Sequence, residues 1–221
     1  MSIPFYFAME ENEATPQAEL NYAQLGFGFS ENGMLRLPRQ RILNAPAVIN
    51  DRILPDKAPD ANLLDELAEA CGSGCFLDFE RQISKVSAAI AVGLMQRLHG
   101  NMTVPPAFHR ICPDANVQIP SILCNNWESF IKTVQTQYGA RWVLEIIPWK
   151  YIVITPWKEE KTGDLSAAIC KYRVKSGSIC YYDTKETIKA KLAIAEAYGC
   201  QAVITLLREY RQVNLKGAQL D

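Results

Sequence analysis

Eight apolar runs are spaced along the chain, and each predicts a β-strand. Most runs are continuous rather than alternating, which is typical of strands covered on both faces in a parallel sheet wrapped by helices. A β-sandwich would show a clearer alternation of apolar and polar positions. The predicted strands are Phe5 to Met9, Gln24 to Phe29, Ala47 to Asn50, Cys75 to Phe79, Met102 to Phe108, Val117 to Leu123, Trp142 to Pro148 and Ala202 to Leu207.

Helical periodicity lies between several of these runs. From Gln82 to Leu98, apolar residues recur every three or four positions, and this spacing predicts a helix with one buried stripe. Three further segments begin at a capping residue and end at a glycine, so they also predict helices. These segments are Asp60 to Gly72, Asn126 to Gly139, and Asp183 to Gly199, in which Asp183 with Glu186 resembles a capping box.

The alternation of strands and helices predicts an α/β fold, and eight strands favour a compact (β/α)8 barrel of the TIM type over an open sheet. The outer helical layer is expected to be incomplete, because Glu31 to Asn44 has no clear helical stripe and Pro16 interrupts the segment after the first strand. Beyond the seventh strand, the sequence predicts a polar loop around Lys158 to Asp164. The Lys175-Ser176-Gly177 turn between two apolar segments then predicts a β-hairpin insertion. No linker or repeat divides the chain, so residues 1–221 are predicted to form a single barrel domain.

Composition narrows the classes of partner. The formal net charge is -1 and basic residues form no run, which argues against nucleic acid and anionic membranes as partners. No apolar stretch is long enough to cross a bilayer, and the absence of a basic leader at the N-terminus predicts a cytoplasmic location. Seven cysteines without a CxxC pair predict reduced thiols, and with two distant histidines they indicate no metal site and no cofactor. Nothing in the composition indicates an oligomeric state.

The most informative motif is the carboxylate pair Asp78 and Glu80 at the end of the fourth predicted strand. Alternate side chains of a strand point to the same face, which places the two carboxylates about 7 Å apart at roughly 3.3 Å per residue. Active sites of (β/α)8 barrels lie at the carboxyl ends of the strands. We therefore expect Asp78 and Glu80 at the barrel mouth, with Asn50 and Asp51 at the end of the third strand as polar lining.

Three segments carry a resemblance to a known family. Gly74 to Glu80 falls on the fourth strand, Arg141 to Trp149 contains an Ile-Pro-aromatic sequence on the seventh, and Tyr172 to Lys191 combines a closing hairpin with a helix that begins Tyr-Asp. In their order and spacing, these segments make the chain resemble glycoside hydrolase family 18, the chitinase-like barrels. It is most similar to the bacterial spore-type branch that acts on peptidoglycan.

The resemblance implies a substrate-assisted glycosidase without metal or cofactor. In that mechanism the N-acetyl carbonyl of the substrate attacks the anomeric carbon, so only one protein acid is needed. Glu80 would be that acid and later the base toward water, while Asp78 would hold the acetamide nitrogen. The implied partner is an N-acetylated oligosaccharide or cell-wall glycan with β-1,4 bonds beside N-acetylglucosamine, and a spore-associated location is consistent with it.

The chain departs from the family pattern in three places. Phe76 and Ser73 stand where the family carries two further aspartates, and the sixth strand lacks its Met-x-Tyr. The eighth strand continues into Leu207 and Arg208 where the family presents a tryptophan that stacks on the sugar. The candidate substrate-binding residues are therefore Asn50, Phe76, Trp149 and Tyr151, with Trp157 as a further aromatic.

Two alternatives remain open on this sequence. In the first, the barrel has lost catalysis and binds glycan or protein, with Asp78 and Glu80 neutralised by a nearby arginine such as Arg52, Arg81 or Arg208. In the second, Glu80 pairs with Glu145 as in retaining glycosidases that use a protein nucleophile about 5 Å from the acid. The second is less favoured, because Glu145 lies within an apolar run whose neighbours fit the first family better.

Overall fold

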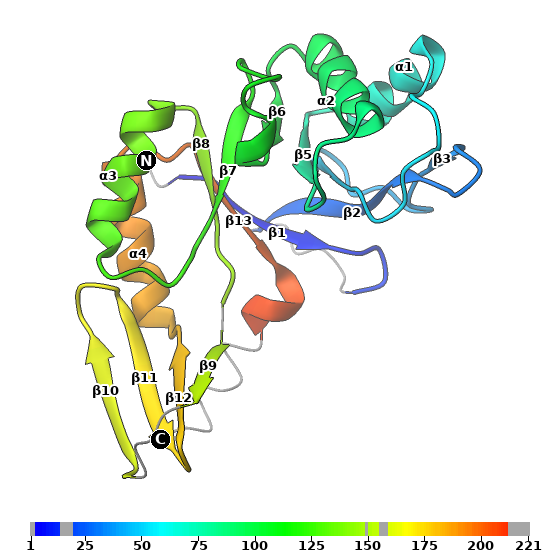
Figure 1. Cartoon of the computed structure of the whole chain (residues 1–221). Coiled ribbons are helices and arrows are strands. Elements are labelled where there is room, and N and C mark those ends of the chain that lie inside the picture. The colour runs from blue at the N-terminus through cyan, green and yellow to red at the C-terminus, as the bar shows by residue number, and fades with distance from the viewer. Residues whose placement is uncertain (1–2, 14–19, 149, 155–158, 212–221) are drawn as a thin grey trace.

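A closed ring of parallel strands forms the body of the protein (Figure 1). The structure, a computed structural model, describes residues 3–13, 20–148, 150–154 and 159–211. Neighbouring strands pair in the order β1, β13, β8, β7, β6, β5, β4, β2, and β1 also pairs with β2, which closes the eight-stranded barrel. The strands are β1 (Phe5–Met9), β2 (Asn21–Phe29), β4 (Ala47–Asn50), β5 (Cys75–Asp78), β6 (Met102–Val104), β7 (Asn116–Pro120), β8 (Trp142–Glu145) and β13 (Ala202–Leu206). The predicted barrel is confirmed.

The outer layer is incomplete, as the sequence predicts. Its helices are α1 (Ala61–Cys71), α2 (Lys85–Leu98), α3 (Trp127–Tyr138), α4 (Lys185–Ala197) and the short 3-10 helix η1 (Pro106–Phe108). Between β2 and β4 the chain forms only the short antiparallel strand β3 (Leu35–Arg36) and turns. The fifth predicted strand is shorter than expected, since η1 takes up its C-terminal half.

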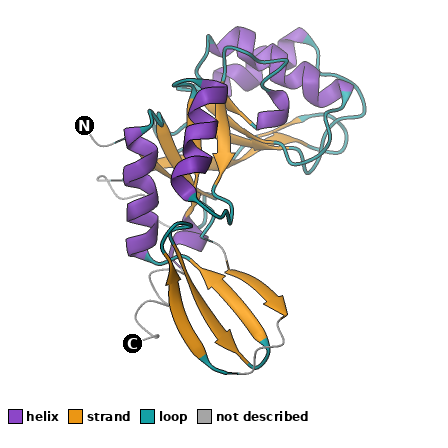
Figure 2. Ribbon diagram, turned by 60° about the vertical axis from the view of Figure 1, so that its left-hand side comes forward, coloured by secondary structure: helices purple, strands orange, loops and turns teal. Residues whose placement is uncertain are grey.

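A small antiparallel sheet projects from the barrel between β8 and α4 (Figure 2). The predicted hairpin is present as β11 (Cys170–Lys175) and β12 (Ser178–Tyr182). It belongs to a larger sheet, because β9 (Lys150–Ile154) pairs with β12 and β10 (Lys161–Leu165) pairs with β11. The segment that contains β10 reads as a polar loop in the sequence, and that interpretation is wrong. Backbone pairing with β11 makes it a strand although its residues are mostly exposed.

Apolar side chains fill the barrel on both sides of its wall. Outside the wall, one cluster packs beneath α1 and α2 and another beneath α3 and α4. Inside, six buried residues form a plug in the lumen, with Tyr6 and Leu25 packed against them. We call this cluster the lumen plug: Ala8, Ala23, Val48, Phe76, Val143 and Ile204.

Two helix starts differ from the sequence prediction. α2 begins after Ser84, which forms a capping box with Ser87, so the helix is shorter than the apolar stripe suggests. α4 is capped by Thr184 and not by Asp183. Asp183 is buried instead, and its carboxylate accepts a hydrogen bond at 2.7 Å from the ammonium of Lys191. A polar residue one position before a cap can thus have a role in the core, which spacing alone does not reveal.

Candidate functional site

The predicted polar site residues Asn50, Asp78 and Glu80 meet at one end of the barrel. Asp78 ends β5 and Asn50 ends β4, and the two residues are direct neighbours in the parallel register. Glu80 follows two residues after Asp78, and all three line one cleft with a volume of about 700 Å³. This is the carboxyl end of the strands, where barrels of this type place their sites. The cleft is large enough to hold several sugar rings by the usual size of ligand pockets.

Strand alternation explains why polar side chains face the lumen at this level. Asp78 is two residues beyond Phe76 of the lumen plug, and Glu145 is two residues beyond Val143, so each points inward like its predecessor. Gln118 on β7 is the register partner of Val143 and is also turned inward. We call Asp78, Gln118 and Glu145, which cap the plug and line the cleft, the lumen floor.

A buried aspartate fixes the backbone at Glu80. Asp51, which follows β4, is 3% exposed. Its carboxylate accepts hydrogen bonds from the backbone N–H groups of Glu80 at 3.2 Å and Arg81 at 2.8 Å. The guanidinium of Arg81 in turn donates to the carbonyl of Arg52 at 2.9 Å. The exposed side chain of Glu80 therefore extends into the cleft from a rigid backbone, which suits a group that must reach a ligand at a fixed position.

Asp78 is held in an environment that favours its proton. Burial is the main cause that raises the pKa of Asp78, and the charges of Glu80 and Asp51 raise it further, while Arg52 opposes the shift. Within the described ranges, no residue donates a hydrogen bond to this carboxylate. Its capacity as an acceptor is therefore open to a ligand.

Glu145 is the third carboxyl group of the cleft. Burial raises the pKa of Glu145 most, and the charges of Asp78, Glu209 and Glu80 add to the shift, while a hydrogen bond from the Gln118 side chain lowers it. The neighbouring backbone is firmly held, because the Glu145 carbonyl accepts a hydrogen bond from the Ser121 N–H at 2.7 Å. Asp78 is thus near enough in the lumen for its charge to act on Glu145.

The aromatic candidates do not gather at the cleft as the acids do. Phe76 is 6% exposed and packs edge-on against Tyr6 at 5.9 Å between ring centroids, within the lumen plug below the cleft. Trp149 and Trp157 lie outside the described residues. Tyr151 lies in β9, which pairs with β12, and its side chain is likewise not described. The roles of these aromatics in substrate binding stay predictions.

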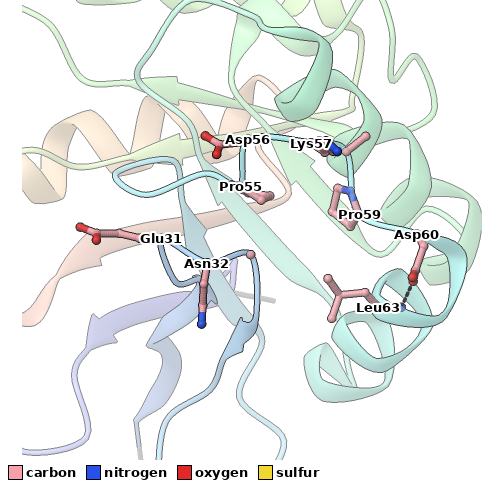
Figure 3. Close-up of a pocket in the computed structure, with 10 residues that line it drawn as sticks. Glu31, Asn32, Pro55, Asp56, Lys57, Pro59, Asp60 and Leu63 are labelled. Carbon is pink, nitrogen blue, oxygen red and sulfur yellow. Dashed lines mark hydrogen bonds between the residues drawn. The ribbon is translucent and has the colours of Figure 1, made fainter.

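A second, smaller pocket of about 360 Å³ lies apart from the predicted residues. Figure 3 shows it between the turn after β2, with Glu31 and Asn32, and the loop that leads into α1. Its Asp60 carboxylate accepts a hydrogen bond from the Leu63 N–H at 2.9 Å and so serves as the helix cap. No cleft carboxylate lines this pocket, so the larger cleft is the better candidate site.

Other kinds of site find no support in the described residues. There, no three His, Cys, Asp or Glu side chains are arranged to hold a metal ion. No helix in the described ranges has the length and apolar character to span a membrane. All seven cysteines are free thiols.

Comparison with known proteins agrees with this geometry at the level of the fold. No family model and no curated protein sequence matches the chain. Among solved structures, the chitinase-like agglutinin of Robinia pseudoacacia is 10% identical, with a TM-score of 0.57 over 90% of this chain and 93% of that one. The spore cortex-lytic enzyme SleL of Bacillus megaterium is 12% identical, with a TM-score of 0.58 over 96% of this chain and 73% of that one.

A GH18 chitinase from Cycas revoluta, solved in complex with (GlcNAc)3, is 10% identical, with a TM-score of 0.58 over 91% of this chain and 94% of that one. The chain is therefore a divergent chitinase-like barrel. The fold is that of glycoside hydrolase family 18, as the three sequence segments predict. At this level of identity the likeness shows the fold, and an activity has to be argued from the site.

The sequence interpretation missed two parts of the site. Gln118 lies in a run read as uniformly apolar, although a glutamine at an inward position of a strand is itself a signal of lumen polarity. Asp51 was expected to line the mouth with Asn50, whereas its carboxylate is buried and anchors the loop that bears Glu80. Only the three-dimensional structure brings that loop against the end of β4.

Proposed function

We propose that the protein hydrolyses β-1,4 bonds beside N-acetylglucosamine residues in chitin-like or cell-wall oligosaccharides. The observation that supports this most is the placement of Asp78 and Glu80 together on the wall of the 700 Å³ cleft at the carboxyl end of the barrel. A single acid and a neighbouring acceptor are the protein groups that substrate-assisted hydrolysis requires.

In the proposed reaction, Glu80 gives its proton to the glycosidic oxygen as the bond to the anomeric carbon breaks. The acetamide carbonyl oxygen of the substrate bonds to that carbon, and Asp78 accepts a hydrogen bond from the acetamide N–H. Glu80 then removes a proton from water as the water oxygen bonds to the same carbon, the bond from this carbon to the acetamide oxygen breaks, and the acetamide is restored. The Asp51 carboxylate holds the backbone of Glu80 during both steps.

Incubation with the N-acetylglucosamine tetramer, followed by mass spectrometry of the products, tests this function. We expect cleavage by the native protein, loss of cleavage in Glu80→Gln, and normal cleavage in the control Glu66→Gln. Glu66 is an exposed glutamate of α1 that does not line the cleft. Equal cleavage by the native protein and Glu80→Gln would sink the assignment of the acid.

A second candidate function is glycan binding without turnover. Phe76 favours it, because a buried phenyl ring lies directly beneath Asp78 and cannot share a proton or a hydrogen bond with it. The name of one similar structure, a chitinase-like agglutinin, supports this alternative. Binding of the same tetramer, seen by calorimetry, with no products after prolonged incubation would favour this alternative.

A further inference from the structure

The lumen floor presents hydrogen-bond acceptors. Asp78 from β5, Gln118 from β7 and Glu145 from β8 reach it from different strands of the barrel wall, and all line the cleft. An ionised carboxylate accepts hydrogen bonds and does not donate them, and the Gln118 amide oxygen is a further acceptor, so a ligand that reaches the ionised floor meets oxygen atoms.

Gln118 supplies an independent sign that a ligand belongs there. Its side chain is 8% exposed, and its Oε1 atom is buried without a hydrogen-bond partner in the described part of the chain. Its side-chain hydrogen bond with Glu145 stabilises the ionised carboxylate, so the amide NH₂ group is the donor. The amide oxygen remains open, and a buried acceptor of this kind is costly unless a donor reaches it.

The charges around the floor are mainly negative. Asp78, Glu80 and Glu209 all act on Glu145 as like charges, and Asp51 acts on Asp78 in the same sense. The basic residues that line the same cleft are Arg36, Arg39, Arg52 and Arg208, and the side chains of all four are exposed. Of these, Arg52 is near enough to lower the pKa of Asp78, but burial and the charges of Glu80 and Asp51 raise that pKa by more.

These observations define the ligand group by its chemistry. A group that donates several hydrogen bonds and carries positive charge would favour the ionised carboxylates, which burial otherwise keeps protonated. A sugar hydroxyl lacks the charge, and among the described residues no three His, Cys, Asp or Glu side chains form a group that could hold a metal ion. A primary ammonium has three donors on one compact cation, which matches three acceptors.

We propose that the lumen floor is a subsite for the protonated amino group of a glucosamine residue, so that the cleft prefers β-1,4 oligosaccharides that are partly deacetylated. This inference rests on the proposed function only in that the cleft accepts a glycan. It does not require that the protein cleaves one. A glucosamine residue whose amine occupies the floor would take the place of the acetamide at Asp78, so it would be bound and not cleaved.

The subsite has a predictable dependence on pH. Burial favours the protonated forms of Asp78 and Glu145, and the charges of neighbouring carboxylates add to this, so in mildly acid buffer the incoming ammonium must displace a proton. Affinity for the amine should therefore increase as pH rises through the pKa values of this pair, and decrease again when the amine itself loses its proton. Glu80, Glu209 and Arg52 face the same space and modulate the position of this rise.

Titration calorimetry of the full chain with glucosamine tetramer and with cellotetraose tests the subsite. These two ligands share the β-1,4 backbone and differ at C2, where one has an amine and the other a hydroxyl. Neither carries the acetamide that substrate-assisted cleavage needs, so the native protein can be used. We expect the glucosamine tetramer to bind at least about tenfold more tightly than cellotetraose, because charge-assisted hydrogen bonds are stronger than those of a neutral hydroxyl.

Matched variants test which residues form the amine subsite. Glu145→Gln and Gln118→Leu should each reduce the preference for the amine by several fold, whereas Glu66→Gln should leave it unchanged, with circular dichroism to confirm folding. Equal affinities for the two tetramers, no binding of either, or a preference that both floor variants retain would overturn the proposal. Calorimetry in buffers of different ionisation enthalpy measures the protons released on binding. The native protein must release protons when it binds the amine in mild acid. Cleavage of the N-acetylglucosamine tetramer is a separate measurement, so the proposed function can fail or hold independently.

Discussion

Replacement of Asp51 by alanine tests how the acid-bearing loop is held. Asp51 is 3% exposed, and its carboxylate accepts the backbone N–H groups of Glu80 at 3.2 Å and Arg81 at 2.8 Å. Hydrogen bonds to a charged group contribute about 1.5–3 kcal/mol each, and water that enters the vacated space recovers part of the loss. We therefore expect Asp51→Ala to lower the free energy of unfolding by about 2–4 kcal/mol.

For a chain of this length, such a change corresponds to a decrease in Tm of roughly 5–15 °C. Urea denaturation measures the free energy, and hydrogen exchange should show faster exchange at the amides of Glu80 and Arg81 in particular. Asp56→Ala is the matched control, because Asp56 is exposed on the neighbouring loop. If Asp51→Ala changes stability by less than about 0.5 kcal/mol, as surface substitutions do, then the loop is not held in the way described.

Two further predictions concern buried charge. Lys191→Met should lower the free energy of unfolding by about 3–5 kcal/mol, because it leaves the buried carboxylate of Asp183 without the ammonium that contacts it at 2.7 Å. Urea denaturation measures this change. The control Lys189→Met, at an exposed position on the same helix, should change the free energy of unfolding little. The raised pKa of Glu145 means that this group contributes stability below its unfolded pKa and loses that contribution as pH rises through its folded pKa. Glu145→Gln should remove this decrease, and a pH series of unfolding free energies that is parallel for both proteins would contradict the assignment.

The sequence predicts the barrel well because its signals are local and repeated. Continuous apolar runs indicate strands covered on both faces, and the capping residues Asp60 and Asn126 begin α1 and α3 as expected. The position of Asp78 and Glu80 follows from strand alternation and from the location of sites in such barrels. Both inferences use only neighbours along the chain, and the structure agrees with them.

What the sequence does not reveal depends on contacts between distant segments. Asp183 has the spacing of a helix cap, yet its burial beside Lys191 makes it part of the core. The exposed residues of β10 carry no strand pattern, and pairing with β11 alone orders them. The position of Gln118 in the lumen floor becomes evident only in the three-dimensional structure, where β7 lies beside β8.

The measurement that tests the central claim most directly is the initial rate of cleavage of the N-acetylglucosamine tetramer by the native protein and by Glu80→Gln. A general acid contributes about 10²–10⁴-fold to the rate, so we predict a decrease of at least about a hundredfold in the variant. The control Glu66→Gln should cleave at the native rate. Native and Glu80→Gln proteins that cleave at rates within about threefold of each other would contradict the account, because the acid at the barrel mouth would then not be Glu80.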